Sequence, residues 1–279
     1  MVKTDYIECG NCLDLLKNLP DECIDLTVTS PPYDNIRDYK GYSFDFEGIA
    51  AELFRVTKQG GVLVWNVADA TIDGDETGTS FRQALFFKEI GFRLNDTMIW
   101  DKECFSFPEA IRYPQVFEFM FVFTKGHLKT FNPIKDRDIK NKIPYWHGTQ
   151  RQKDGSLKKV KKEARIEEKG VKFNVWHIWP AHNKTGHPAV FPIQIAKDHI
   201  LSWSNEGDIV LDPFMGSGTT AIACVEANRH YIGFEISEEY VSLAKRRIDI
   251  ETKPNAKMII EDKETKQMNI FDFGGKEDE

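Results

Sequence analysis

Short apolar segments alternate along the chain with segments of helical periodicity, and this alternation most constrains the fold. The segment 62–67 (VLVWNV) is apolar almost throughout, as expected of a strand covered on both faces. Strands that alternate with helices need right-handed crossovers, which give a mostly parallel sheet with helices on both sides. We therefore predict a doubly wound α/β fold. The predicted strands are 24–29, 62–67, 92–100, 116–124, 208–211 and 231–235, and the predicted helices are 11–19, 46–57, 80–90, 191–203, 217–228 and 237–250, with Ser80 and Ser237 as N-caps.

A basic segment interrupts this alternation. The 279 residues carry a net charge of −7, yet residues 125–172 contain 15 Lys and Arg against 6 Asp and Glu, which gives this segment +9 and leaves −16 for the remainder. Such asymmetry is typical of a protein in which one basic segment contacts phosphate groups and the rest of the protein does not. A solvated lysine-rich surface gives the same counts of charged residues. We therefore divide the chain into two halves of one α/β domain, an insertion and a tail. The predicted bounds are 1–124 and 187–252 for the two halves, 125–186 for the basic insertion and 253–279 for the polar tail.

Composition and cysteine usage exclude several classes of protein. Hydrophobic residues make up 41% of the chain and charged residues 29%, as in a folded globular protein rather than a disordered one. No apolar run approaches the roughly 20 residues that span a bilayer, and the opening MVKTDYIECG is not a signal peptide, so we expect a cytoplasmic protein without a membrane partner. Cys9 and Cys12 have C-x-x-C spacing, but no second pair completes a site, and we predict no bound metal.

A glycine-rich loop follows the predicted strand 208–211 and precedes a helix. Its sequence, residues 212–220, is DPFMGSGTT. Glycine lacks a Cβ atom, so Gly216 and Gly218 let the backbone turn tightly and approach a ligand. A phosphate-binding P-loop would need a lysine where Gly218 stands. The next strand ends in Glu235, and a carboxylate in that place accepts hydrogen bonds from both hydroxyl groups of a ribose. The loop and Glu235 together predict a nucleoside cofactor held without a phosphate clamp.

A second loop, Ser30-Pro31-Pro32-Tyr33, follows the predicted strand 24–29. Consecutive prolines fix φ and donate no backbone hydrogen bonds, so their carbonyl groups face outward from a rigid turn. Such a loop suits a planar heterocycle with an exocyclic amine. Ser30 and the Pro31 carbonyl would accept its two N–H groups, and Tyr33 would stack on the ring. Taken alone, the same four residues also fit an ordinary proline-rich surface turn.

Together the two loops resemble the paired motifs of DNA amino-methyltransferases, which use S-adenosylmethionine to methylate N4 of cytosine or N6 of adenine. SPPY precedes DPFMGSGTT with a variable stretch between them, an order that resembles the permuted beta group of that family. Gly10-Asn11-Cys12 resembles the segment that contacts the adenine of the cofactor, and residues 187–192 (HPAVFP) resemble the segment that lines its methionine end. The resemblance covers about residues 6–250 apart from the basic insertion. It implies an enzyme like those of restriction-modification systems or phages, with the insertion as the target-recognition region.

The resemblance and the charge of the insertion imply three groups of site residues. Family members often carry Asp where Asn11 stands, but an asparagine can also pair with the amino group of adenine. The target nucleotide must leave the duplex stack to reach such a site. The catalytic group is Ser30, Pro31, Pro32 and Tyr33; the cofactor-binding group is Asn11, Cys12, Pro188, Phe191, Asp212, Phe214, Gly216, Ser217, Gly218, Thr219 and Glu235; the DNA-binding group is Arg37, Lys142, Arg151, Lys158 and Lys159.

The first residue of the tetrapeptide bears on the target base. Within the family, serine there goes mostly with N4-cytosine and aspartate with N6-adenine, so Ser30 favours cytosine and leaves an N6-adenine enzyme as the alternative. A protein or RNA methyltransferase is less favoured, because such enzymes usually place the cofactor motif first and lack a basic insertion. A DNA-binding module without activity is disfavoured by the intact Ser30, Tyr33, Asp212 and Glu235.

The polar tail contains one short apolar motif. Residues Gln267-Met268-Asn269-Ile270-Phe271 resemble the peptide by which bacterial proteins dock on the DNA sliding clamp. Packing of Ile270 and Phe271 onto the enzyme body is the alternative. Double-stranded DNA is thus the predicted substrate, and a sliding clamp and a second copy of the chain are further candidate partners.

Overall fold

The computed structural model describes residues 2–32, 44–104, 111–139, 145–163, 168–180 and 192–252, with the backbone alone for 145–147 and 161–163. Several sequence-based predictions therefore lie outside the described residues. They are Tyr33, Arg37, Lys142, Pro188, Phe191 and the clamp-like motif 267–271. Compact packing divides the chain into two units, residues 1–132 with 174–279 and residues 133–173.

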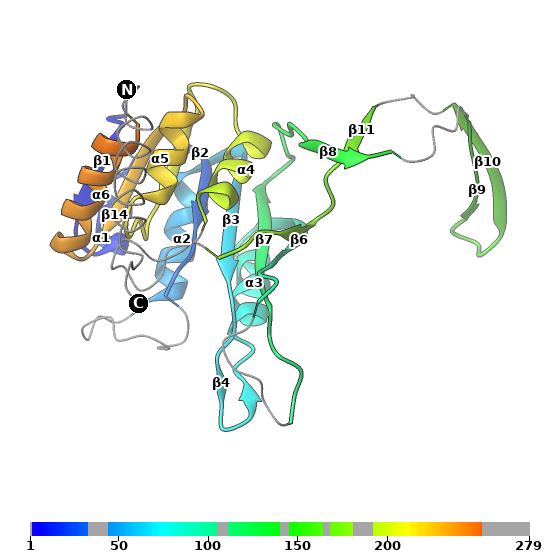
Figure 1. Cartoon of the computed structure of the whole chain (residues 1–279), viewed down its shortest axis with the longest axis horizontal. Coiled ribbons are helices and arrows are strands. Elements are labelled where there is room, and N and C mark those ends of the chain that lie inside the picture. Colours follow the sequence, from blue (N-terminus) through cyan, green and yellow to red (C-terminus); the bar gives the residue numbers. More distant parts are fainter. Residues whose placement is uncertain are drawn as a thin grey trace, which may run out of the picture. The chain divides into compact units, whose positions relative to one another are not determined.

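An eight-stranded sheet forms the centre of the first unit (Figure 1). Seven of its strands run in one direction, and β7 alone is antiparallel to its two neighbours. The predicted mostly parallel sheet is thereby confirmed. In spatial order the strands are β1 (Tyr6–Cys9), β14 (His230–Glu235), β13 (Ile209–Asp212), β2 (Ile24–Thr29), β3 (Thr57–Val67), β7 (Phe117–Lys125), β6 (Phe92–Asp101) and β12 (Val175–His177).

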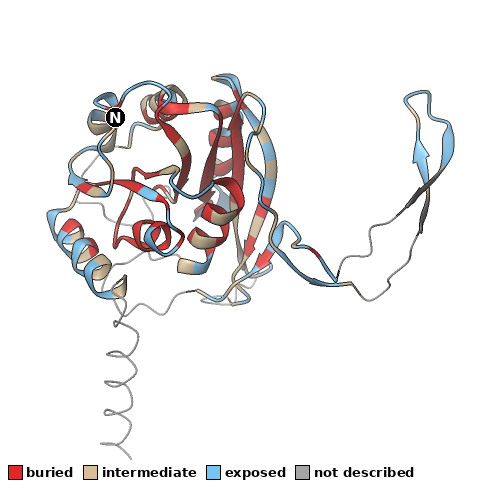
Figure 2. Cartoon of the chain, turned by 90° about the horizontal axis from the view of Figure 1, so that it is seen from above, coloured by how far each residue is buried: buried red, intermediate tan, exposed pale blue. Residues whose placement is uncertain are grey.

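Helices cover both faces of this sheet, and the central strands are buried between them (Figure 2). One face packs against α4, α5 and α6, and the opposite face packs against α1, α2 and α3. This two-sided covering explains why strands such as β3 are apolar along most of their length. The helices are α1 (Cys12–Lys17), α2 (Phe46–Val56), α3 (Thr79–Glu89), α4 (Ile193–Trp203), α5 (Thr219–Glu226) and α6 (Glu238–Glu251). None of the helices in the described ranges is long and apolar enough to cross a membrane.

The prediction that Ser80 caps α3 is wrong. The N-cap residue is Gly78, and Ser80 lies inside the first turn, where its backbone N–H donates to Asp69 Oδ1 at 2.7 Å. The Ser80 hydroxyl donates to Asp69 Oδ2 at 2.5 Å. A carboxylate from the loop after β3 therefore satisfies the helix N-terminus that the serine was expected to satisfy. Ser237 does occupy the N-cap position of α6, although its side chain makes no capping hydrogen bond.

The second unit, residues 133–173, consists of two antiparallel strand pairs. In one of them, β8 (Lys135–Asp138) pairs with β11 (Lys169–Val171), and the Arg137 guanidinium lies 4.5 Å from the Phe173 ring centroid. In the other, β9 (Tyr145–Arg151) pairs with β10 (Leu157–Glu163) as a hairpin. This unit lies within the predicted insertion 125–186 but is shorter, because β12 belongs to the main sheet and Asn132 donates to the Ser204 carbonyl of the first unit. The first unit also contains a short antiparallel pair after β3, formed by β4 (Thr71–Ile72) and β5 (Asp75–Glu76).

Candidate active site

A buried hydrogen bond joins the two loops that the sequence singled out. The Thr29 hydroxyl, at the end of β2, donates to Asp212 Oδ1, at the end of β13, over 2.6 Å. The two strands are parallel neighbours, with Leu211 paired to Thr27. Their carboxyl ends therefore meet at the same edge of the sheet, where ligands of open α/β sheets bind. The SPPY and DPFMGSGTT loops both start at this edge, although 183 positions separate the bonded residues.

Asp212 connects three parts of this edge. In addition to Thr29, its carboxylate accepts from the Thr220 hydroxyl (2.6 Å, Oδ2) and from the Phe214 backbone N–H (3.0 Å, Oδ1). The residue is only 1% exposed. Burial raises its pKa to about 6, against the opposing effect of the three donors. Asp212 thus fixes the shape of the glycine-rich loop and ties that loop to β2.

Gly216 and Gly218 of the loop are each required by the backbone, but their surroundings differ. Both adopt left-handed backbone angles, with φ of 53° at Gly216 and 87° at Gly218. The Gly216 N–H donates to Glu235 Oε2 at 2.8 Å, so this turn orients the loop toward the end of β14. At Gly218, a Cβ atom would lie 2.9 Å from the Cβ of Ala244 on α6. The missing side chain of Gly218 therefore makes room for α6, and its predicted contact with a ligand stays a prediction.

Glu235 lies at the end of β14, and backbone groups hold its carboxylate in place. Its Oε1 accepts from the Ser237 N–H at 2.9 Å, and its Oε2 accepts the bond from Gly216. Burial is the main cause of its raised pKa. The backbone carbonyl of Glu235 also accepts from the Gly10 N–H at 3.0 Å. This contact brings the segment after β1 beside the same carboxylate.

The segment after β1 contains the two remaining described residues of the predicted cofactor group. Asn11 is the N-cap of α1, and its side-chain oxygen accepts from the Leu13 N–H at 2.9 Å. Cys12 begins the helix, and burial raises the pKa of its thiol to about 12, so it is a neutral side chain at physiological pH. The predicted cofactor residues that the structure describes therefore come together from the ends of β1, β13 and β14.

The donor set at this edge fits a nucleoside better than a phosphate. Residues 212–220 contain no Lys or Arg. Arg247 of α6 approaches the loop, but its Nη1 donates to the Ser217 carbonyl and hydroxyl, both at 2.8 Å, and its Nε donates to Glu251. A half-buried carboxylate at the strand end matches the hydroxyl groups of a ribose. Ser217 and Thr219, two further residues of the predicted cofactor group, are buried.

The described part of the tetrapeptide follows directly on β2. Thr29 pairs with Trp65 of β3, and Ser30 is the next residue. Ser30 and Pro32 are half-buried, and Pro31 is buried. Phe214 of the glycine-rich loop packs against Trp65 of β3, with the two ring centroids 6.3 Å apart.

Sequence reasoning missed a polar chain at the same edge of the sheet. Asn66, near the end of β3, is 4% exposed and donates from Nδ2 to Glu118 Oε2 at 2.7 Å. Glu118 Oε1 accepts from the Lys102 ammonium at 3.3 Å. These three residues come from three different strands or strand ends, so no local motif marks them. The available signal was a polar residue within or just after each of the predicted strands 62–67, 92–100 and 116–124.

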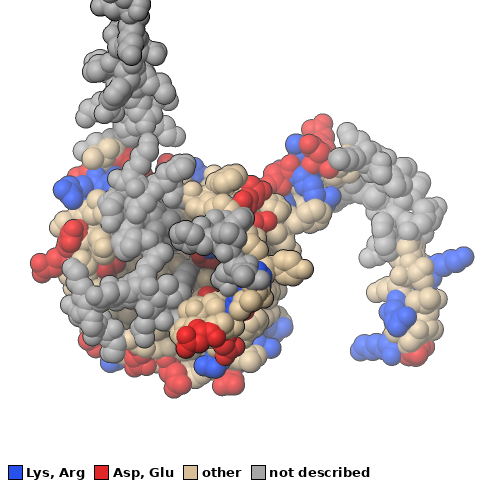
Figure 3. Space-filling model, turned by 60° about the horizontal axis from the view of Figure 1, so that its bottom comes forward, with Lys and Arg blue, Asp and Glu red and all other residues tan. Residues whose placement is uncertain are grey.

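The predicted DNA-binding residues that the structure describes lie on the β9–β10 hairpin. Arg151, Lys158 and Lys159 are all exposed, and basic side chains gather on this hairpin in Figure 3. The strand register places Thr149 opposite Lys159 and Leu157 opposite Arg151, so Arg151 and Lys159 share one face of the hairpin. Lys158 lies on the other face, opposite Gln150.

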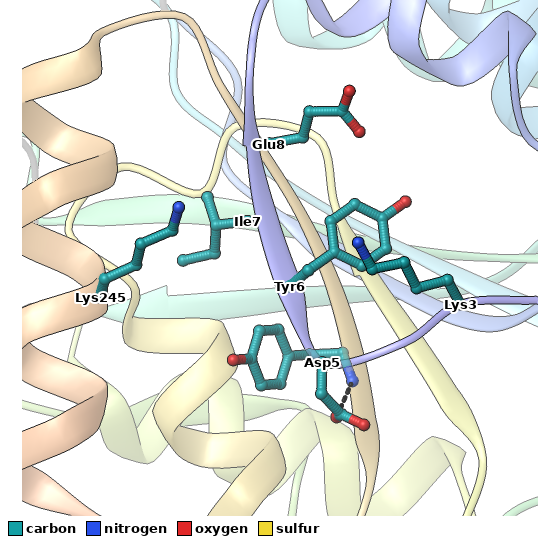
Figure 4. Close-up of a pocket in the computed structure, with 7 residues that line it drawn as sticks. Lys3, Asp5, Tyr6, Ile7, Glu8 and Lys245 are labelled. Carbon is teal, nitrogen blue, oxygen red and sulfur yellow. Dashed lines mark hydrogen bonds between the residues drawn. The ribbon is translucent and has the colours of Figure 1, made fainter.

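A pocket of about 400 Å³ lies elsewhere, beside the edge strand β1 and α6 (Figure 4). Its lining side chains point in several directions and carry both signs of charge, and none belongs to a predicted site. They are Lys3, Asp5, Tyr6, Ile7, Glu8, Tyr231 and Lys245. Among the described residues, no group of three or more His, Cys, Asp or Glu side chains is arranged to hold a metal ion.

Sequence comparisons place the chain among DNA methyltransferases. The sequence model of the DNA methylase family matches residues 24–246. The orphan methyltransferase M.BamHII of Bacillus amyloliquefaciens is 55% identical over 241 residues, which cover 83% of this chain and 91% of that protein. The type II methyltransferase M.HpaI of Haemophilus parainfluenzae is 30% identical over 261 residues, covering 87% of this chain and 74% of that protein. The chain therefore belongs to the N6/N4 DNA methylase family, as its two loops predicted.

Solved structures share the same fold. The M1.HpyAVI complex with S-adenosylmethionine superposes with a TM-score of 0.60 at 26% identity, covering 87% of this chain and 98% of that one. The cytosine-N4-specific PvuII DNA methyltransferase superposes with a TM-score of 0.64, covering 88% and 86%, but at 20% identity this likeness shows the fold alone. The predicted α/β methyltransferase fold is thus confirmed.

Proposed function

We propose that this DNA methyltransferase transfers a methyl group from S-adenosylmethionine to the exocyclic N4 of a cytosine flipped out of double-stranded DNA. The hydrogen bond between Thr29 and Asp212 carries the proposal, because it brings the start of the SPPY loop within reach of the glycine-rich loop. An enzyme that joins two substrates needs this kind of convergence. The solved complex of M1.HpyAVI with S-adenosylmethionine supports the choice of this cofactor.

The proposed cofactor residues act in two ways. Glu235 accepts hydrogen bonds from the ribose hydroxyl groups, since two backbone N–H groups already hold its carboxylate at the strand end. Asn11, Cys12 and Phe214 surround the adenine, and Pro188 and Phe191 line the methionine end. Asp212 acts through the loop, because it is buried and its carboxylate accepts from three protein donors, whereas the carboxylate of Glu235 is only half-buried. Bound S-adenosylmethionine supplies an electrophilic methyl group on its sulfonium.

The tetrapeptide prepares the nucleophile. The amine of cytosine is a poor nucleophile, because its lone pair is delocalised into the ring. Hydrogen bonds from its two N–H groups to Ser30 and to the Pro31 carbonyl favour the pyramidal amine, whose lone pair points away from the ring plane. Stacking on Tyr33 positions the base and stabilises the positive charge that develops on the nitrogen. Extrusion of the base costs about a few kcal/mol of stacking and pairing energy, which contacts to the DNA must supply.

Basic residues supply those contacts in this proposal. Arg151, Lys158 and Lys159 project from a two-stranded hairpin, a shape that the DNA major groove admits. Their charge neutralises phosphates, together with Lys142 in the same insertion. Arg37, in the segment after Tyr33, contributes to closure over the flipped base. We expect Arg37→Ala to weaken DNA binding or turnover and to leave cofactor affinity unchanged.

The base assignment rests on Ser30, which favours cytosine over adenine. The deciding experiment incubates unmodified genomic DNA with the enzyme and labelled S-adenosylmethionine, then identifies the methylated nucleoside by mass spectrometry. N4-methylcytosine is the expected product, and the Ser30→Ala variant should form it much more slowly. N6-methyladenine would overturn the base assignment and support the alternative N6-adenine enzyme. Label found in protein or RNA but not in DNA would overturn the substrate class.

A further inference from the structure

The polar chain Lys102–Glu118–Asn66 lies on the face of the sheet that packs against α4. Elsewhere on that face the neighbouring strands contribute apolar side chains, with Val64, Met98 and Val122 in a single buried cluster. At the carboxyl end of β3 the apolar surface gives way to an amide and an ion pair. The side chains of Glu118 and Lys102 are 12% and 25% exposed, so the ion pair is largely withdrawn from water.

The alternation of side chains along a strand predicts that Ser30 lies on the same face of the sheet as Lys102, Glu118 and Asn66. Val28 and Val64 belong to one core cluster, and each is followed two residues later by Ser30 and Asn66 respectively. Thr29, the last residue of β2, is paired with Trp65 of β3, so Ser30 leaves β2 at the level of Asn66 on the adjacent parallel strand. Such strands lie about 4.8 Å apart, and side chains at the same level of neighbouring strands are in reach of each other.

Glu118 fixes the orientation of the Asn66 amide. A carboxylate is an acceptor only, so the Asn66 atom that lies 2.7 Å from Glu118 is the donating Nδ2. The carbonyl oxygen Oδ1 consequently occupies the other position of the amide. The Lys102 ammonium lies 3.3 Å from the other oxygen of Glu118, which holds the carboxylate in place. The network thus presents an oriented, polarised acceptor at the edge where Ser30 stands.

Stability alone does not explain this arrangement. Removing charges from water is costly, and a well-packed apolar replacement is often as stable as a buried ion pair or more so. On the same face of the sheet, the side chain two residues earlier on β3 is the apolar Val64. A role in the methyl-transfer reaction explains a polar network beside Ser30 better than stability does.

We propose that Asn66, held by Glu118, is a positioning residue that acts through Ser30. With the target base in place, Asn66 Oδ1 accepts the hydrogen of the Ser30 hydroxyl, and the lone pairs of Ser30 Oγ then accept a hydrogen bond from the exocyclic amine. A hydroxyl has one hydrogen to donate, so directing it to Asn66 makes Ser30 an acceptor toward the base. This inference rests on the proposed function and adds the residues that set the direction of its key hydrogen bond.

A double-mutant cycle tests the inference. The variants Asn66→Ala, Ser30→Ala and the double variant are compared in single-turnover methylation of DNA, with equilibrium binding of S-adenosylmethionine measured in parallel. We expect Asn66→Ala to lower the rate about tenfold to a hundredfold, as loss of an orienting partner does, and to leave cofactor affinity unchanged. In the Ser30→Ala background, the same change should lower the rate less than about twofold, since coupled residues are not additive. Equal fold-losses in both backgrounds would overturn the inference.

Two further variants separate positioning from structure. Glu118→Gln keeps the volume and removes the charge, so it should lower the rate in the wild-type background and leave the rate of Ser30→Ala unchanged. The matched control is Gln83→Met on the opposite face of the sheet, where Gln83 accepts a buried hydrogen bond from Trp65 Nε1 at 2.8 Å. This control should lose stability as Asn66→Ala does and keep its methylation rate. A wild-type enzyme that leaves DNA unmethylated would refute the proposed function itself, whereas additive losses in an active enzyme refute only the role of Asn66.

Discussion

The α-carbon of Gly218 faces Ala244 so closely that a Cβ atom added to the glycine would lie 2.9 Å from the alanine Cβ. The glycine-rich loop is therefore pressed against α6, and its shape depends on that helix. Arg247, one turn further along α6, donates to the Ser217 carbonyl and adds a polar contact to the same junction.

Gly218→Ala should destabilise the protein and weaken cofactor binding. The new side chain meets both a left-handed backbone, with φ of 87°, and the Ala244 contact. Left-handed backbone costs about 1–2 kcal/mol for a residue with a Cβ, and overpacking adds about 1–3 kcal/mol. Urea denaturation and titration with S-adenosylmethionine provide the measurements. The matched control is Gly207→Ala, which has φ of 81° but nothing within 4 Å of the added Cβ, so it should show the backbone cost alone. Equal losses in the two variants would contradict the contact with α6.

Thr29→Val should impair the site while preserving the shape of β2. The valine has nearly the same volume but cannot donate to Asp212, which removes the 2.6 Å bond between the two loops. Loss of a hydrogen bond to a buried acceptor costs about 1–3 kcal/mol, and we expect a lower methylation rate as well. Thr29→Ser retains the hydroxyl and should recover most of both properties. A Thr29→Val enzyme with normal stability and rate would show that the loops converge without this bond.

Asp212 should make the protein less stable as the pH rises from about 4 to about 6. Burial raises its folded-state pKa to about 6 from an ordinary 3.8, so between these values the folded protein holds a proton that the unfolded chain has released. Stability from this group is complete below the unfolded pKa and is lost as the pH passes the folded pKa, a change of about 3 kcal/mol for such a difference.

Asp212→Asn should remove that pH dependence, because the amide does not titrate and retains a carbonyl for Thr29 and Phe214. The free energy of unfolding, measured in urea at a series of pH values, checks this expectation. Asp138→Asn is the control, since Asp138 is exposed and its pKa is lowered by a hydrogen bond from Lys169. It should leave the fall between pH 4 and 6 in place. An unchanged fall in Asp212→Asn would contradict the assignment.

The β9–β10 hairpin should contribute to DNA affinity through charge. Replacing Arg151, Lys158 and Lys159 together by alanine should weaken DNA binding and reduce the slope of log affinity against log salt by about 0.9 for each phosphate that the variant no longer neutralises. Cofactor affinity should not change. Lys88→Ala, on the exposed side of α3, is the control for removal of a surface charge. An unchanged salt slope in the triple variant would exclude the hairpin from the DNA interface.

The sequence predicted the sheet well where a strand was long and apolar, and poorly where it was short or polar. All six predicted strands and six predicted helices are present, with ends shifted by up to five residues, the largest shift being at the start of β3. It missed β1, because YIEC has only four residues and contains a charge, and β12, because VWH has three. Such strands form because a neighbour already provides a row of backbone partners, β14 and β6 respectively, and this is a tertiary effect.

The site was predictable to the extent that it depends on local motifs. SPPY, the glycine-rich loop and Glu235 are each contiguous or at strand ends, so their chemistry could be read without coordinates. The chain Lys102–Glu118–Asn66 could not, because its members meet only through the pairing of β3, β7 and β6. Likewise, nothing local indicates that Asp69, eleven positions before Ser80, caps α3.

The order of strands in the sheet has a consequence for biosynthesis. β1 and β2 come first in the chain, but β13 and β14, which fill the space between them, follow β12 and are made after it. Until then the tetrapeptide stands beside an unfinished sheet and has no Asp212 to anchor it. The edge of the sheet that carries both loops is therefore incomplete until β13 and β14 have been made.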